Sequence, residues 1–157
     1  MDEKEFIEGL KKIVWPSNLG YHDLLNIISA DIKNKFVPIE IFAVDNLNPL
    51  EAVIKYLKEN RKLKYSQIAD LLERDDRVIW NTYNKIKIKI SLSDKSTLLI
   101  PINTFQNKKL SILESLIIHL KNNLRFNFTE IAFKLSRDPR NIWKVYNNGM
   151  KKINEKY

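Results

Sequence analysis

The chain has 157 residues, enough for one ordinary domain or two very small ones, and its hydrophobic share of 44% is typical of a globular protein. It lacks cysteine, which excludes disulfides, thiolate metal sites and cysteine nucleophiles. No apolar run approaches the roughly 20 residues that cross a bilayer, and the acidic N-terminus does not resemble a signal peptide. We therefore expect a soluble cytoplasmic protein.

The net charge of +8 is unevenly distributed along the chain. Residues 101–153 hold ten basic and three acidic side chains, whereas residues 38–90 hold ten basic and eight acidic ones. A basic excess concentrated in one small module is typical of a protein that binds a polyanion, although surface solvation alone also produces moderate excesses.

The N-terminal segment, residues 1–37, is predicted to form two helices. Residues 2–14 place apolar side chains at helical spacing, and Trp15-Pro16 ends that helix. A second helix is predicted over about 22–35. Its apolar face is wide: Leu24, Leu25, Ile27, Ile28, Ile32 and Phe36. Such a face has to be buried, either against the rest of the chain or against a second chain.

The rest of the chain is organised by an internal repeat. Residues 74–84 read Arg-Asp-Asp-Arg-Val-Ile-Trp-Asn-Thr-Tyr-Asn, and residues 137–147 read Arg-Asp-Pro-Arg-Asn-Ile-Trp-Lys-Val-Tyr-Asn. At this offset of 63 residues the two copies align without a gap from Pro38 over Pro101 to Ile90 over Ile153, and 22 of the 53 aligned pairs are identical. Two copies of this length indicate a duplicated small domain, with unit 1 at 38–90, a linker at 91–100 and unit 2 at 101–157.

Each unit is predicted to form three helices. The first spans about 48–60 in unit 1 and 111–123 in unit 2, and the second begins at a cap residue, Ser66 or Thr129. The third begins at Asp75 or Asp138, because Asp138-Pro139 is an N-cap followed by proline at the first helical position. The inward face of the third helix is predicted to carry Ile79, Tyr83 and Ile86, or Ile142, Tyr146 and Ile153.

The end of the first unit has two interpretations. Residues 86–91 alternate Ile-Lys-Ile-Lys-Ile-Ser, which would suit a strand paired with residues 97–100 in a hairpin wing. The second copy, Gly149-Met150-Lys151-Lys152-Ile153, does not alternate. We therefore favour a helix that continues to about Ile88, followed by a linker to Leu99.

Residues 65–72 read Tyr-Ser-Gln-Ile-Ala-Asp-Leu-Leu and are followed by Arg77-Val78-Ile79, and residues 128–135 read Phe-Thr-Glu-Ile-Ala-Phe-Lys-Leu. This pattern resembles the helix-turn-helix in the fourth conserved region of bacterial sigma factors and related transcription regulators. The resemblance covers both repeats and implies an all-α fold of tandem helix-turn-helix units that bind double-stranded DNA. Ala69 and Ala132 are small residues in the second helix, which lets the third helix cross it closely.

In a helix-turn-helix the third helix enters the major groove, and its N-terminal residues contact base edges. The predicted base-contacting residues are Arg77, Val78, Asn81 and Thr82 in unit 1 and Arg140, Asn141, Lys144 and Val145 in unit 2. The predicted phosphate contacts are Arg74, Arg137, Lys121, Arg125 and Lys134. For Arg77 and Arg140 an alternative stays open, in which each forms a salt bridge with its own Asp cap or holds the turn.

Trp80 and Trp143 occupy the same position of the two repeats. They could stack on DNA, pack between the units, or close the hydrophobic core beside the third helix. Packing is the commonest role of a large aromatic side chain, so we favour it.

Nothing in the sequence indicates an enzyme. His22 and His119 lack metal-binding partners at useful spacing, and glycine-rich phosphate loops, nucleophile elbows and paired carboxylates are absent. We therefore expect no metal and no cofactor.

The sequence favours sequence-specific DNA binding in transcriptional control, with unit 2 as the stronger electrostatic contact. Two units on one chain can act as a covalent pseudo-dimer, and an imperfect repeat is expected in the operator. The main alternative is a protein-interaction or assembly module, in which residues 1–37 mediate homodimerisation or binding to RNA polymerase. A third hypothesis is binding to structured RNA.

Overall fold

The computed structural model describes residues 26, 29–89, 91–96 and 98–155, and the chain divides into two compact units, residues 1–33 and 34–157. Of the first unit, residues 26 and 29–33 are described and are helical. The predicted helix over 2–14 and residues 22–25, 27 and 28 of the one over 22–35 lie outside the described residues. In the part that is described, no helix is long and apolar enough to span a membrane.

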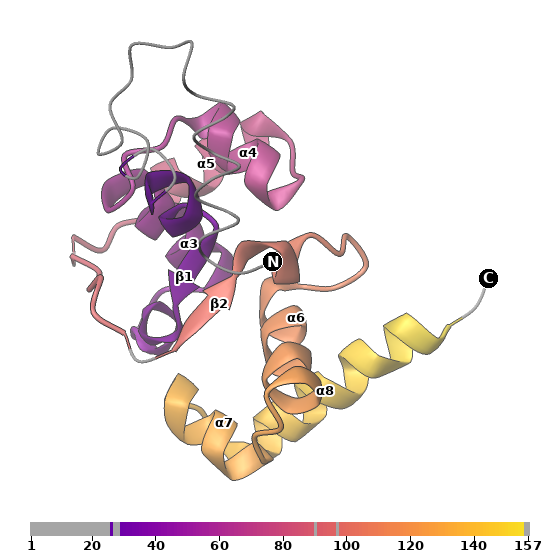
Figure 1. Cartoon of the computed structure of the whole chain (residues 1–157). Helices are drawn as coiled ribbons and strands as arrows, with labels where there is room; N and C mark the ends of the chain where they lie inside the picture. The colour runs from indigo at the N-terminus through magenta and orange to yellow at the C-terminus, as the bar shows by residue number, and fades with distance from the viewer. Residues whose placement is uncertain (1–25, 27–28, 90, 97, 156–157) are drawn as a thin grey trace, which may run out of the picture. The chain divides into compact units, whose positions relative to one another are not determined.

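The main unit, residues 34–157, is mostly helical (Figure 1). Its first half contains β1 (Phe36–Pro38), the 3₁₀-helix η1 (Ile39–Ala43), α3 (Pro49–Glu59), α4 (Tyr65–Leu72) and α5 (Asp76–Lys85). Its second half contains β2 (Leu99–Pro101), the 3₁₀-helix η2 (Ile102–Phe105), α6 (Ile112–Ile118), the π-helical turn η3 (His119–Asn123), α7 (Phe128–Leu135) and α8 (Pro139–Asn154). Each of the five elements of the first half has a counterpart that begins 63 residues later.

A short sheet was not predicted. β1 and β2 pair antiparallel with Phe36 opposite Pro101, Val37 opposite Ile100 and Pro38 opposite Leu99. Val37 and Ile100 are fully buried, so this pair of strands joins the two halves through a dry contact. The expectation of a purely α-helical fold is therefore too narrow.

Among the described residues the hairpin wing is not formed, because residues 86–89 and 91–96 form no strand and β2 pairs with β1 instead. The prediction of a helix to about Ile88 is wrong as well, since α5 ends at Lys85. Ile86 and Ile88 pack partly against the core while Lys87 and Lys89 are exposed, which explains the alternating pattern without a partner strand.

Gly149 accounts for the different lengths of α5 and α8. A Cβ atom at Gly149 would lie 2.8 Å from Ile118 Cδ1 and 3.2 Å from Glu114 Cβ, so the glycine lets α8 pass close to α6. The first half has Ile86 at this position, and there the helix stops. Beyond Gly149, Lys152 Nζ lies 2.8 Å from the nearly buried Glu114 carboxylate. Ile153 lies past this contact and is 42% exposed, so its predicted inward position is wrong.

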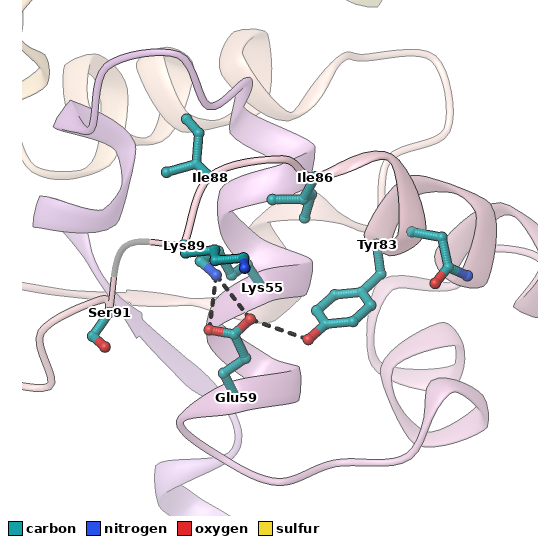
Figure 2. Close-up of a pocket in the computed structure, with 8 residues that line it drawn as sticks. Lys55, Glu59, Tyr83, Ile86, Ile88, Lys89 and Ser91 are labelled. Carbon is teal, nitrogen blue, oxygen red and sulfur yellow. Dashed lines mark hydrogen bonds and ion pairs between the residues drawn. The ribbon is translucent and has the colours of Figure 1, made fainter.

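Figure 2 shows a pocket of about 400 Å³ at the place where the chain leaves α5. Glu59 is one of the residues that line it, with its carboxylate 2.8 Å from the buried Lys55 ammonium and accepting a hydrogen bond of 3.1 Å from the Tyr83 hydroxyl. The polar groups of Lys55, Glu59 and Tyr83 in this pocket are thus bonded to one another.

The predicted linker is anchored to α3 over its first residues. Leu92 is buried, and its carbonyl accepts a hydrogen bond of 2.7 Å from the Asn60 amide. Asp94 accepts a hydrogen bond of 2.7 Å from the Tyr56 hydroxyl and lies 3.2 Å from the Arg61 guanidinium. These contacts hold residues 92–94 against the first half of the main unit.

The predicted caps of the third helices are confirmed, since Asp75 and Asp138 each accept a hydrogen bond of 2.8 Å from the backbone N–H two residues later. The predicted caps of the second helices are wrong. α4 and α7 begin one residue before Ser66 and Thr129, and their N-cap residues are Lys64 and Asn127. Asn127 forms a capping box with Glu130, which satisfies two backbone N–H groups that Thr129 cannot reach.

Non-glycine residues in the left-handed region end both second helices. Glu73 and Ser136 both have φ near 50°, a conformation that strains L-residues by roughly 1–2 kcal/mol and suits glycine. We predict that Ser136→Gly raises the free energy of unfolding by about 0.5–1 kcal/mol in urea titrations, after the extra chain entropy of glycine is subtracted. The control is Ser66→Gly inside α4, which should lower it by a similar amount. Equal effects in the two variants would contradict this account.

His119 gives the stability of the main unit a pH dependence. Burial lowers the pKa of the His119 imidazole below its ordinary value of 6.5. The unfolded chain therefore takes up a proton first as the pH falls, so stability is full above about 6.5 and declines below it. We predict a lower urea midpoint at pH 5.5 than at pH 7.5, with a smaller difference in His119→Gln. An unchanged difference in this variant would exclude His119 as the cause.

Candidate nucleic-acid interface

Three-residue turns connect α4 to α5 and α7 to α8, at 73–75 and 136–138. In each turn the N–H of the arginine donates to the carbonyl of an alanine in the preceding helix, Arg74 to Ala69 at 3.0 Å and Arg137 to Ala132 at 2.9 Å. Both alanines are buried and the two helices of each pair pack against each other, which a small side chain in the second helix favours. This geometry sets the direction in which the first turn of α5 or α8 points.

Arg77 and Arg140 lie in those first turns and are exposed. Asp75 and Asp138 use their carboxylates to accept the backbone N–H of the same arginines. Within the part of the chain that the structure describes, neither guanidinium forms an ion pair or a hydrogen bond. The salt bridge to the cap is therefore not observed, and both guanidinium groups are available to a ligand.

α8 presents a basic face along its exposed side. Arg140, Lys144 and Lys151 are spaced by four and seven residues, which places them within about 40° of one another around the helix. All three are exposed. The equivalent face of α5 carries Arg77 and Asn81, and this helix ends before a position matching Lys151 is reached.

The remaining predicted base-contacting residues differ in exposure. Val78 is 43% exposed and Asn141, at the same repeat position, is also exposed. Thr82 and Val145 are half-buried, and Val145 packs partly against the core. These last two residues are thus placed at the edge of the candidate interface.

Two of the predicted phosphate contacts, Lys121 and Lys134, lie beside aromatic rings. Lys121 Nζ lies 4.8 Å from the centre of the Phe128 ring, and Lys134 Nζ lies 5.0 Å from that of Phe126, so both cations rest on aromatic faces. Arg125 is exposed and has a left-handed φ of 62°.

Arg74 and Arg137 are half-buried, and the Nε atom of each is buried without a hydrogen-bond partner among the described residues. A buried donor that lacks a partner is unusual in folded proteins. It occurs at the same position of both halves, beside the first turn of α5 or α8. Arg74 and Arg137 thus differ from the other predicted phosphate contacts in having a buried Nε donor without a partner among the described residues.

Sequence reasoning missed an aromatic contact that occurs in both halves. The rings of Tyr65 and Tyr83 lie 5.9 Å apart, and those of Phe128 and Tyr146 lie 5.3 Å apart. Each pair links the start of the second helix to the third turn of the third helix. The signal was present in the sequence, because all four aromatic residues align at the offset of 63.

Trp80 and Trp143 are 53% and 57% exposed, so the packing interpretation is wrong. Trp143 lies about 60° around α8 from Arg140 and therefore flanks the basic face. In the first half a pocket of about 410 Å³ lies beside Trp80 and is lined by Tyr65, Asp76, Arg77 and Asn81. The indoles thus belong to the exposed surface of α5 and α8.

Among the described residues, no three His, Asp or Glu side chains lie close enough together to hold a metal ion. Comparisons with family models, with curated proteins and with solved structures find no match to this chain.

The exposure of the tryptophans leads to a stability prediction. Trp143→Ala should lower the free energy of unfolding by about 1 kcal/mol or less, because a large part of the indole stays in water in the folded state. The neighbouring Ile142 is fully buried, so Ile142→Ala should lower it by about 2–5 kcal/mol. Urea titrations of both variants test this. Similar losses in the two would mean that Trp143 is part of the core.

Proposed function

We propose that residues 34–157 bind double-stranded DNA through α5 and α8 and act in transcriptional control. In this proposal α4–α5 and α7–α8 are two helix-turn-helix units on one chain, and the protein is a binding protein without enzymatic activity. The three-residue turns and the buried alanines Ala69 and Ala132 support this assignment, because a helix-turn-helix joins its two helices by a turn of 3–4 residues.

The observation that carries the proposal is the exposed basic face of α8. Arg140, Lys144 and Lys151 are exposed on one side of a helix whose first turn follows the interhelical turn. This is where a recognition helix presents side chains to the major groove. An arginine there can pair with guanine through two hydrogen bonds, and lysine can contact guanine or phosphate.

The two units differ in electrostatic strength. Asp76 stands in the first turn of α5, where α8 has Pro139, and Asn81 stands where α8 has Lys144. Both differences make α5 less attractive to phosphate. The α7–α8 pair is therefore the main electrostatic contact with DNA, and the α4–α5 pair adds a weaker one.

Exposed aromatic side chains support a second candidate function, a protein-interaction module. Phe133 on α7 is 87% exposed, and Trp80 and Trp143 are more than half exposed. Large aromatic residues are enriched in the buried centres of protein interfaces. In this alternative the partner would cover the indoles, and the basic face would only assist solubility.

Binding to a random-sequence duplex at two salt concentrations tests the proposal. We predict that affinity falls steeply with salt, because bound counterions are released from the phosphates. Arg140→Ala/Lys144→Ala should weaken binding by about tenfold or more and make the salt dependence less steep. The matched control is Lys95→Ala/Lys108→Ala, which removes two exposed lysines outside both helix pairs and should have a much smaller effect.

Two results would contradict the proposal. Absence of binding at low salt would remove DNA as the ligand and would favour the protein-interaction candidate. Equal weakening by the two double variants would show a general charge effect, without a role for α8.

A further inference from the structure

The contacts between the two halves of the main unit occur in equivalent pairs. Replacing each residue of a contact by the residue at the same position of the other half gives a contact that is also observed. In the sheet, Phe36 pairs with Pro101, and adding or subtracting 63 converts this pair into Leu99 with Pro38, which is also observed. The central pair, Val37 with Ile100, converts into itself. This register is that of a local twofold axis passing through the Val37–Ile100 pair.

Contacts outside the sheet follow the same exchange. The Ile39 N–H donates to the Leu98 carbonyl at 3.1 Å, and the equivalent Ile102 N–H donates to the Lys35 carbonyl at 2.9 Å. The rings of Phe42 and Phe105, which are equivalent residues, lie 5.7 Å apart and contact each other.

The packing of whole elements follows the same symmetry, since η1 packs on α7 and the equivalent η2 packs on α4. Figure 1 shows the α4–α5 and α7–α8 pairs on opposite sides of the strands and of α3 and α6. The interface therefore resembles that of a twofold-symmetric dimer, in which the same patch of both partners is used.

We propose that the main unit reads an imperfect inverted repeat in one DNA duplex, an inference that rests on the proposed function. Helix-turn-helix dimers bind half-sites whose symmetry mirrors that of the protein. A twofold axis relates α5 to α8, so their half-sites run in opposite directions along the duplex. Modules related by translation would instead match a direct repeat.

The spacing of the half-sites is fixed in this arrangement. The strands, η1 and η2 hold the two halves together, and the first part of the connecting segment is tied to α3 through Leu92 and Asp94. Flexibly linked units would accept a range of spacings. The main unit accepts one.

The imperfection of the repeat lies in three positions. Arg77 and Arg140 are identical and select the same base in both half-sites. The positions that differ are Val78 and Asn141, Asn81 and Lys144, and Thr82 and Val145. Asparagine suits adenine, lysine suits guanine, and valine suits the thymine methyl group, so the half-sites diverge where these side chains reach.

Selection of binding sites from a random duplex pool tests the inference with variants that make the two helices alike. Val78→Asn/Asn81→Lys/Thr82→Val gives α5 the three residues of α8. The reciprocal variant, Asn141→Val/Lys144→Asn/Val145→Thr, gives α8 those of α5. Most of these positions are exposed and none is fully buried, so equal urea midpoints serve as the check on folding.

We expect the wild type to enrich an imperfect inverted repeat at a single spacing. The first variant should enrich a perfect inverted repeat of one half-site, and the reciprocal variant a perfect inverted repeat of the other. The wild-type protein should bind its inverted site about a hundredfold more tightly than the same half-sites rearranged as a direct repeat.

The inference and the proposed function fail in different ways. Enrichment of direct repeats, of lone half-sites or of inverted repeats with variable spacing would overturn the inverted-repeat inference while DNA binding stands. Bridging of two separate duplexes would overturn it as well. No enrichment, together with no duplex binding at low salt, would remove both.

Discussion

The antiparallel pairing of β1 with β2 is the constraint on which the rest of the main unit depends. Only three residue pairs are involved, but their register makes the two halves exchange equivalent contacts. Burial of Val37 and Ile100 excludes water from the sheet, and the Phe42–Phe105 contact extends the apolar interface beyond it. Through these contacts η1 reaches α7 and η2 reaches α4, so each helix pair is supported by the opposite half.

The two halves share this framework and differ in the third helix. Gly149 and the Lys152–Glu114 ion pair let α8 continue along α6, whereas Ile86 ends α5 beside the Lys55–Glu59 pair. The longer helix also carries Lys144 and Lys151, which α5 does not match. The two halves thus share equivalent elements, and differences at a few residues give α8 the longer basic face.

The sequence predicted those parts of the fold that are repeated and local. The helix spans followed from aligned apolar residues, and the Asp75 and Asp138 caps followed from the Asp-Pro pair of the second copy. The strands could not be predicted, because each is three residues long and its partner is distant in the chain. The caps Lys64 and Asn127 were missed because Ser66 and Thr129, two residues later, are also residue types that favour an N-cap. The exposure of Trp80 and Trp143 could not be predicted from the sequence. Each tryptophan directly follows a buried isoleucine, Ile79 or Ile142, and the spacing alone does not tell whether a neighbouring element also covers the tryptophan.

In the proposed complex, both helix pairs contact one duplex in a twofold arrangement. Hydroxyl-radical footprinting of the wild-type protein on an enriched duplex tests it most directly. We expect two protected segments on each strand, related by a dyad and lying on one face of the DNA. A single protected segment, or two segments in the same orientation, would contradict it.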